Sequence, residues 1–163
     1  MGAGTGMMAF GLKAGVGTAS RIIESEDAKY TLGVLVLSNF GRREDLRFLG
    51  KKIDLRLENE HNNREKNTGG SIIVVVATDA PLTSRQLNRI CKRAPLGISR
   101  TGGYAAHGSG DVNENSKEFQ KLLAATVDVT EEAILNSLLM AKTIDGRDNH
   151  EAPSLDINRL NED

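Results

Sequence analysis

Residues 67–82 read NTGGSIIVVVATDAPL and place a serine at the junction of two very different segments. The residues before it, 58–70, are almost all polar or charged, whereas residues 72–77 are all aliphatic. This pattern predicts an exposed loop that enters a central strand covered on both faces. Taken alone, Gly69-Gly70-Ser71 is typical of a flexible loop leading into a strand.

The position of Ser71 also fits the requirements of backbone self-cleavage. Its hydroxyl would attack the carbonyl of Gly70, where glycine permits strained dihedral angles and an unhindered approach. An N-to-O acyl shift followed by hydrolysis would leave Ser71 as a new N-terminus. An α-amine has an intrinsic pKa near 8, so it would accept the hydroxyl proton near neutral pH. We therefore predict cleavage between Gly70 and Ser71, with Ser71 as nucleophile.

Composition excludes several classes of partner. The chain has 163 residues, about one domain, with a formal net charge of -1 and a pI near 6.3, so no global charge attracts nucleic acid or anionic membrane. The longest aliphatic run has six residues and is too short to span a bilayer. The N-terminus lacks the basic and apolar regions of a signal peptide. We expect a cytoplasmic protein.

Periodicity predicts strands at residues 30–40, 53–57 and 72–77, the second of them half-exposed. A helix is predicted at residues 83–94, where Thr83 and Gln86 form a capping box. Pro95 should end or kink it near Arg93 or Ala94, and Cys91 lies on its apolar stripe, which favours a buried thiol in a reducing compartment.

Two helices are expected to close the chain. The first covers residues 116–125; the second begins at an Asp128 cap and stops at Gly146, with Ala133, Ile134, Leu138 and Ala141 on one face. Strands followed by helices indicate an α+β fold.

The first twenty residues, MGAGTGMMAFGLKAGVGTAS, are glycine-rich and suggest a phosphate-binding loop. Such a loop needs a preceding strand and a following helix N-terminus, and neither is evident. We favour a turn-rich wall of some other site. His, Cys and carboxylate residues show no metal-ligand spacing, so neither a metal nor another cofactor is expected.

Five collinear motifs together resemble the DmpA-type family of self-processing aminopeptidases, which includes L-aminopeptidase/D-Ala-esterases and β-aminopeptidases. They are GTGM…KAGVGTASR, GVLVLSNFGRRE, GGSIIVVVATDAPL, LGISRTGG…GSGD and TEEAILNSLLMAKTIDGRD. The resemblance implies part of a four-layer αββα sandwich of N-terminal-nucleophile-hydrolase type, with the connectivity shared by the ornithine acetyltransferases. Residues 1–70 would then end an α-chain-like segment and residues 71–163 form a β-chain-like segment.

The resemblance also implies roles for individual residues. Ser71 would be the nucleophile, Asn39 in SNFG the oxyanion-stabilising amide, and Ser109 with Asp111 in GSGD the polar pair connected to Ser71. Each has an ordinary structural alternative: a turn for Asn39, loop polarity for Ser109 and a cap for Asp111. The complete set of motifs favours the functional interpretation.

His107 and Lys13 are weaker candidates. Ser71, His107 and Asp111 would form a conventional triad, but the family does not use histidine at this position. We expect His107 at the edge of the site, lining the substrate. Lys13 is a second substrate-lining candidate, although a solvated side chain is the favoured alternative.

The family precursor has a further segment before the glycine-rich stretch, so residues 1–163 are expected to form a single incomplete catalytic domain. Its strands would lack cover and would depend on a separately encoded N-terminal half or on a homo-oligomer of processed α/β pairs. The predicted activity is hydrolysis of N-terminal residues from small peptides, amides or esters. The alternatives are an acyltransferase of the ornithine acetyltransferase type and an inactive fragment with a structural role.

Overall fold

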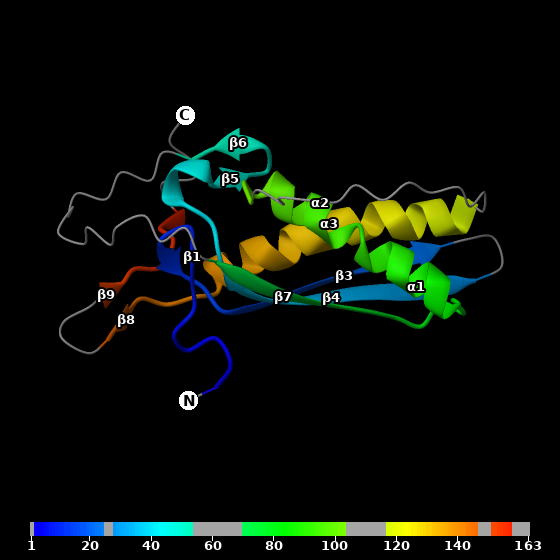
Figure 1. Ribbon diagram of the computed structural model, residues 1–163, viewed down its shortest axis with the longest axis horizontal. Coiled ribbons are helices and arrows are strands. Elements are labelled where there is room, and N and C mark those ends of the chain that lie inside the picture. The colour runs from blue at the N-terminus through cyan, green and yellow to red at the C-terminus, as the bar shows by residue number, and fades with distance from the viewer. Residues whose placement is uncertain (1, 25–27, 54–69, 104–116, 147–150, 158–163) are drawn as a thin grey trace.

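A three-stranded antiparallel sheet forms the centre of the computed structural model (Figure 1), which describes residues 2–24, 28–53, 70–103, 117–146 and 151–157. Its strands are β3 (Val16–Glu24), β4 (Lys29–Asn39) and β7 (Ser71–Thr78), in the order β3-β4-β7. The strands predicted at 30–40 and 72–77 are confirmed to within one residue at each end. Strand β3 was not predicted, because its alternating small and polar residues resemble a turn-rich segment.

One face of the sheet packs against a long helix, α3 (Lys117–Leu139), which lies along β3 and β4 (Figure 1). Every second residue of β4 points to this helix, since side chains alternate along a strand. The result is a core of fully or almost fully buried side chains that includes Val34, Val36, Val129, Ile134 and Leu138.

Helix α3 corrects the prediction of two helices, because it continues without a break through Asp128. The Asp128 side chain is exposed and pairs with Arg100 at 2.6 Å instead of capping a helix. The buried hydroxyls of Thr126 and Thr130 each donate to the carbonyl four residues earlier, at 2.7 Å, so β-branched polar residues are satisfied inside the helix. The predicted stop at Gly146 is also wrong, since α3 ends at Leu139.

Helices α1 (Ser84–Cys91) and α2 (Ala94–Arg100) pack against α3 on the same side of the sheet. The capping box of Thr83 and Gln86 is confirmed. The chain stops being helical after Cys91, and α2 then begins with Pro95 in its first turn, where proline needs no hydrogen-bonded N–H. Cys91 is exposed, so the prediction of a buried thiol is wrong.

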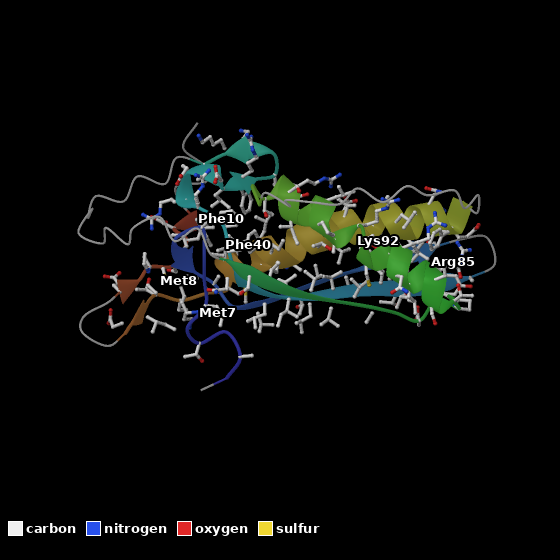
Figure 2. The ribbon with its side chains drawn as sticks, in the orientation of Figure 1. Met7, Met8, Phe10, Phe40, Arg85 and Lys92 are labelled. Carbon is white, nitrogen blue, oxygen red and sulfur yellow. The ribbon has the colours of Figure 1, made fainter. Side chains whose placement is uncertain are left out.

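The other face of the sheet carries apolar side chains that no described element covers. Its exposed large side chains are Val16, Ile22, Leu35, Ile73 and Val75. Strand alternation and register place them on the face opposite to the buried residues of β4, and Figure 2 shows side chains projecting from the side of the sheet away from the helices. The prediction that residues 72–77 are covered on both faces is therefore wrong for this chain, and β7 is an edge strand in the described part of the sheet.

Short hairpins surround one end of the sheet. They pair β1 (Met8–Ala9) with β2 (Leu12–Lys13), β5 (Arg47–Phe48) with β6 (Lys51–Lys52), and β8 (Ile144–Asp145) with β9 (Glu151–Ala152). A 3-10 turn, η1 (Arg43–Asp45), precedes β5. The strand predicted at 53–57 falls almost entirely outside the described residues. No helix in the described ranges is both long and apolar enough to cross a bilayer.

Candidate active site

Ser71 and Asn39 are direct partners across the β4–β7 ladder. Ser71 is the first residue of β7, Asn39 is the last of β4, and the antiparallel register places them opposite each other. Residues opposite in an antiparallel pair share one face, with Cβ atoms about 4.5–5.5 Å apart. Two side chains that are 32 positions apart in the sequence thus meet at one end of the uncovered apolar face.

The side-chain amide of Asn39 is oriented by the backbone of the N-terminal segment. Its Oδ1 accepts a hydrogen bond from the Met8 N–H at 3.2 Å. With Oδ1 engaged, the NH₂ group becomes the part of the amide that donates to a ligand. Asn39 is half-buried, whereas Ser71 is exposed. A developing negative charge beside Ser71 would therefore meet an oriented donor, as oxyanion stabilisation requires.

Two backbone hydrogen bonds hold the chain on either side of Asn39. Phe10 donates to the Phe40 carbonyl at 2.9 Å, and Ser38 donates to the Gly15 carbonyl at 3.0 Å. The rings of Phe10 and Phe40 pack edge-to-face at 5.2 Å between centroids, near Met7 and Met8 (Figure 2). The glycine-rich opening therefore forms a wall around the end of β4, in keeping with the turn-rich wall favoured over a phosphate-binding loop.

Gly70 lies where the chain has little room for a side chain. A Cβ at this position would lie 3.0 Å from both Cα and Cβ of Phe40. Gly70 does not have a positive φ, so the expected backbone strain is absent. The requirement for glycine next to Ser71 thus comes from close packing against Phe40.

Lys13 is buried, with only 5% of its surface exposed, so the expected solvated side chain is wrong. Its ammonium donates to the carbonyls of Gly4 at 2.9 Å, Met7 at 3.3 Å and Ala14. Removal from water lowers the pKa of the Lys13 ammonium below its usual 10.5. The buried position was detectable in part, because Lys13 is the one charged residue among the first twenty.

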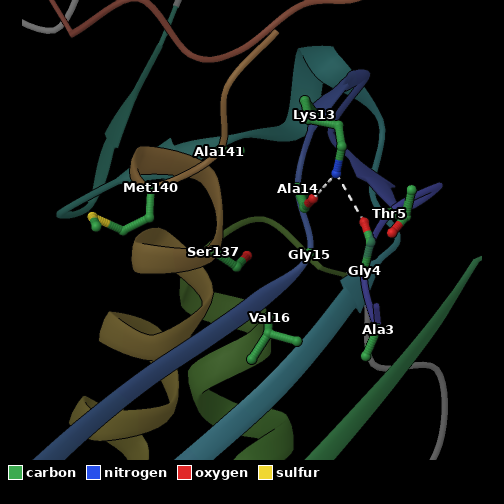
Figure 3. A pocket seen from close by; sticks show the side chains of 10 residues that line it. All are labelled: Ala3, Gly4, Thr5, Lys13, Ala14, Gly15, Val16, Ser137, Met140 and Ala141. Atoms are coloured by element: carbon green, nitrogen blue, oxygen red, sulfur yellow. Dashed lines mark hydrogen bonds between the residues drawn. The ribbon is translucent and has the colours of Figure 1, made fainter. Parts of the chain in front are cut away.

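A pocket of about 320 Å³ lies beside Lys13 (Figure 3). Its wall combines the N-terminal turn, the start of β3 and the end of α3, with Gly4, Lys13, Val16, Ser137 and Met140 among the lining residues. Neither Asn39 nor Ser71 lines it. The pocket therefore adjoins the N-terminal wall and does not itself enclose the predicted nucleophile.

Three predicted site residues, His107, Ser109 and Asp111, lie outside the described residues. The structure therefore brings together Ser71, Gly70 and Asn39, with Lys13 behind the N-terminal wall. Across the described ranges there is no group of three or more His, Cys, Asp or Glu side chains that could hold a metal ion.

The sequence matches the model of Peptidase family S58 over residues 1–152, and the chain belongs to this family. Two curated relatives are β-peptidyl aminopeptidases BapA. The one from Sphingosinicella microcystinivorans is 37% identical over 90% of this chain and 46% of its own length. The one from Sphingosinicella xenopeptidilytica is 34% identical over 91% of this chain and 46% of its own length.

Solved structures agree with the family assignment. A protein from Pyrococcus horikoshii OT3 matches with a TM-score of 0.78 and 50% identity, over 98% of this chain and 49% of that one. The L-aminopeptidase D-Ala-esterase/amidase of Ochrobactrum anthropi is described as a prototype for the serine aminopeptidases and a new variant of the Ntn hydrolase fold. It matches with a TM-score of 0.75 and 31% identity, over 96% of this chain and 49% of that one. A Burkholderia sp. β-aminopeptidase matches with a TM-score of 0.75 and 29% identity, over 96% of this chain and 50% of that one.

The chain thus spans about half the length of the relatives it matches. Its fold is the α+β fold of Ntn-hydrolase-type aminopeptidases, and the described part supplies one sheet layer and the helical layer that covers it.

Proposed function

We propose that this chain carries the nucleophile of a serine aminopeptidase or amidase, which removes N-terminal residues from small peptides, amides or esters. The observation that supports it best is the pairing of Ser71 with Asn39, whose amide is oriented by Met8. Family membership supports the same reaction class.

Self-cleavage is the proposed first step. The Ser71 oxygen attacks the Gly70 carbonyl carbon, and the Gly70–Ser71 C–N bond breaks as the new ester forms. The Ser71 nitrogen takes up the hydroxyl proton and becomes an amine. Water then hydrolyses the ester, which leaves a Gly70 carboxylate and a free Ser71 at the head of β7. Residues 1–70 and 71–163 become separate chains that remain paired through the β4–β7 ladder.

The same hydroxyl is proposed to attack the substrate. Its proton passes to the Ser71 α-amine, while Ser109, oriented by Asp111, hydrogen-bonds the Ser71 oxygen. The carbonyl oxygen becomes an oxyanion that the Asn39 amide stabilises. The α-amine gives this proton to the leaving amine or alcohol, which departs and leaves an acyl-Ser71 intermediate. Water then attacks the ester, and the acid and the free Ser71 hydroxyl are released. This arrangement needs neither histidine nor a cofactor, and it leaves His107 at the edge of the site.

The uncovered apolar face indicates how the site is completed. Side chains such as Ile73 and Val75 are 58% and 52% exposed, on the same face as Ser71 and Asn39. We propose that a separately encoded N-terminal half supplies a second sheet over this face, which would bury the apolar residues and exclude water from the site. Processed α/β pairs would then assemble into a homo-oligomer in the cytoplasm.

Intact-mass measurement and a serine-directed acylating probe test the proposal. The full chain should divide between Gly70 and Ser71 over time, and the probe should then label the fragment that begins at Ser71. The Ser71→Ala variant should remain whole and unlabelled. Ser20→Ala, which changes an exposed serine of β3, is the matched control and should behave like the parent.

A parent chain that stays at full length and unlabelled, alone and with an added N-terminal half, would contradict the proposal and favour the inactive fragment. Labelled chain that transfers an acetyl group to ornithine, but does not hydrolyse aminoacyl nitroanilides, would favour the acyltransferase.

A further inference from the structure

We propose that Lys13 is a positioning residue for the candidate oxyanion amide, acting on Asn39 through the peptide group between Met7 and Met8. The inference deepens the proposed function and rests on the role proposed for Asn39. It gives a reason for a buried cation that the reaction itself does not use.

A continuous series of hydrogen bonds connects the two side chains. The Lys13 ammonium donates to the Met7 carbonyl at 3.3 Å. That carbonyl and the Met8 N–H belong to the same planar peptide group. The Met8 N–H in turn donates to Asn39 Oδ1 at 3.2 Å. Lys13 and Asn39 are therefore joined through one rigid peptide.

The direction of every hydrogen bond in this series strengthens the NH₂ group of Asn39 as a donor. A cation at the Met7 carbonyl draws electron density toward the oxygen, which makes the Met8 N–H a stronger donor. A stronger donor at Oδ1 makes the NH₂ group of Asn39 a stronger donor too, since hydrogen bonds in a chain polarise one another. The NH₂ group is the part of Asn39 that would meet the oxyanion.

The position of Lys13 also fixes the shape of the N-terminal wall. Its ammonium joins the carbonyls of Gly4 and Ala14 to that of Met7 (Figure 3 shows the first two). Gly4 has a positive φ of 88°, and a Cβ there would lie 2.9 Å from Gly15 Cα. The turn is therefore closed tightly around the cation, and the Met7–Met8 peptide is held in place from behind.

A buried cation with no carboxylate partner is costly to a fold. Within the described part of the chain, no carboxylate forms an ion pair with Lys13, and its ammonium is compensated by three carbonyl dipoles. An apolar side chain would fill the same space without desolvating a charge. The cation is therefore explained better by its hydrogen bonds to three carbonyls, that of Met7 among them, than by apolar packing.

Nuclear magnetic resonance of the full chain tests the connection without requiring catalysis. The NH₂ signals of Asn39 are identified by their loss in Asn39→Asp. Lys13→Gln should shift or broaden them, whereas Lys29→Gln, which changes an exposed lysine of the same strand as Asn39, should leave them in place. Unchanged Asn39 signals in folded Lys13→Gln would overturn the proposal.

If Lys13→Gln does not fold, the Nζ signal of Lys13 in an Asn39 variant tests the connection instead. Asn39→Ala keeps Lys13 intact, and the Nζ signal of Lys13 should move, because a coupling between two groups is reciprocal. A Lys13 Nζ signal that is identical in the parent and in Asn39→Ala would overturn the connection.

Kinetics separate a positioning role from a structural one. In the parent background, Lys13→Gln should lower kcat by about 10- to 100-fold, the scale expected for a small misplacement of a catalytic group, with little change in KM. In the Asn39→Ala background, Lys13→Gln should lower kcat almost no further. An equal loss of kcat in both backgrounds would refute positioning through Asn39. An inactive parent whose Asn39 signals still respond to Lys13→Gln would instead count against the proposed function alone.

Discussion

Replacing Asn39 by aspartate or by alanine separates stability from catalysis at the candidate site. Aspartate keeps an oxygen at the position of Oδ1, so the Met8 N–H retains its partner and now donates to a carboxylate. The NH₂ donor is lost, and a negative charge stands opposite Ser71. Alanine removes the donor and also leaves the Met8 N–H without its acceptor.

The expected magnitudes differ accordingly. Loss of one oxyanion donor costs about 10²–10³ in rate, equivalent to about 2.7–4 kcal/mol. Both variants should show at least this loss in acylation of Ser71. An unsatisfied, partly buried N–H costs about 1–3 kcal/mol, and a domain of this size loses roughly 2–4 °C in Tm per kcal/mol. Only Asn39→Ala should therefore melt measurably earlier than the parent.

Two assays on the same samples are sufficient: the rate of Ser71 labelling by an acylating probe, and thermal unfolding by circular dichroism. If the probe labels Ser71 of Asn39→Asp at a rate within about tenfold of the parent rate, the oxyanion role of Asn39 is refuted, since this variant lacks the NH₂ donor. Equal Tm values for all three proteins would instead refute the contribution of the Met8 bond to stability.

Substitutions at three places test the packing around the site. Ile134→Ala, at a fully buried position under the sheet, should lower the free energy of unfolding by about 2–5 kcal/mol in denaturant titrations, and Ile134→Val by about 0.5–1.5 kcal/mol. Gly70→Ala should slow the appearance of the two chains in timed intact-mass spectra, because its Cβ crowds Phe40; processing at the parent rate would contradict this. Ile73→Lys with Val75→Lys should weaken binding of an added N-terminal half in sedimentation measurements at little cost in stability, since both side chains are exposed. Undiminished binding would show that the N-terminal half does not cover this face.

Much of the fold was predictable where one local pattern dominates. The aliphatic run after Ser71 and the β-branched run before Asn39 specify strands regardless of their surroundings. The capping box at Thr83 likewise specifies a helix start. Prediction failed where a local signal competes with packing: Asp128 resembles a cap, but the helix continues through it because the flanking residues are buried against the sheet.

Sequence alone determined the candidate nucleophile, the glycine before it and the family to which the chain belongs, because these depend on residue types in a fixed order. Only the tertiary structure decided that Asn39 faces Ser71, that Met8 orients the Asn39 amide and that the Lys13 ammonium donates to the Met7 carbonyl. The reason is physical: strand register and hydrogen bonds between separate segments depend on how the chain packs, and no local pattern encodes them.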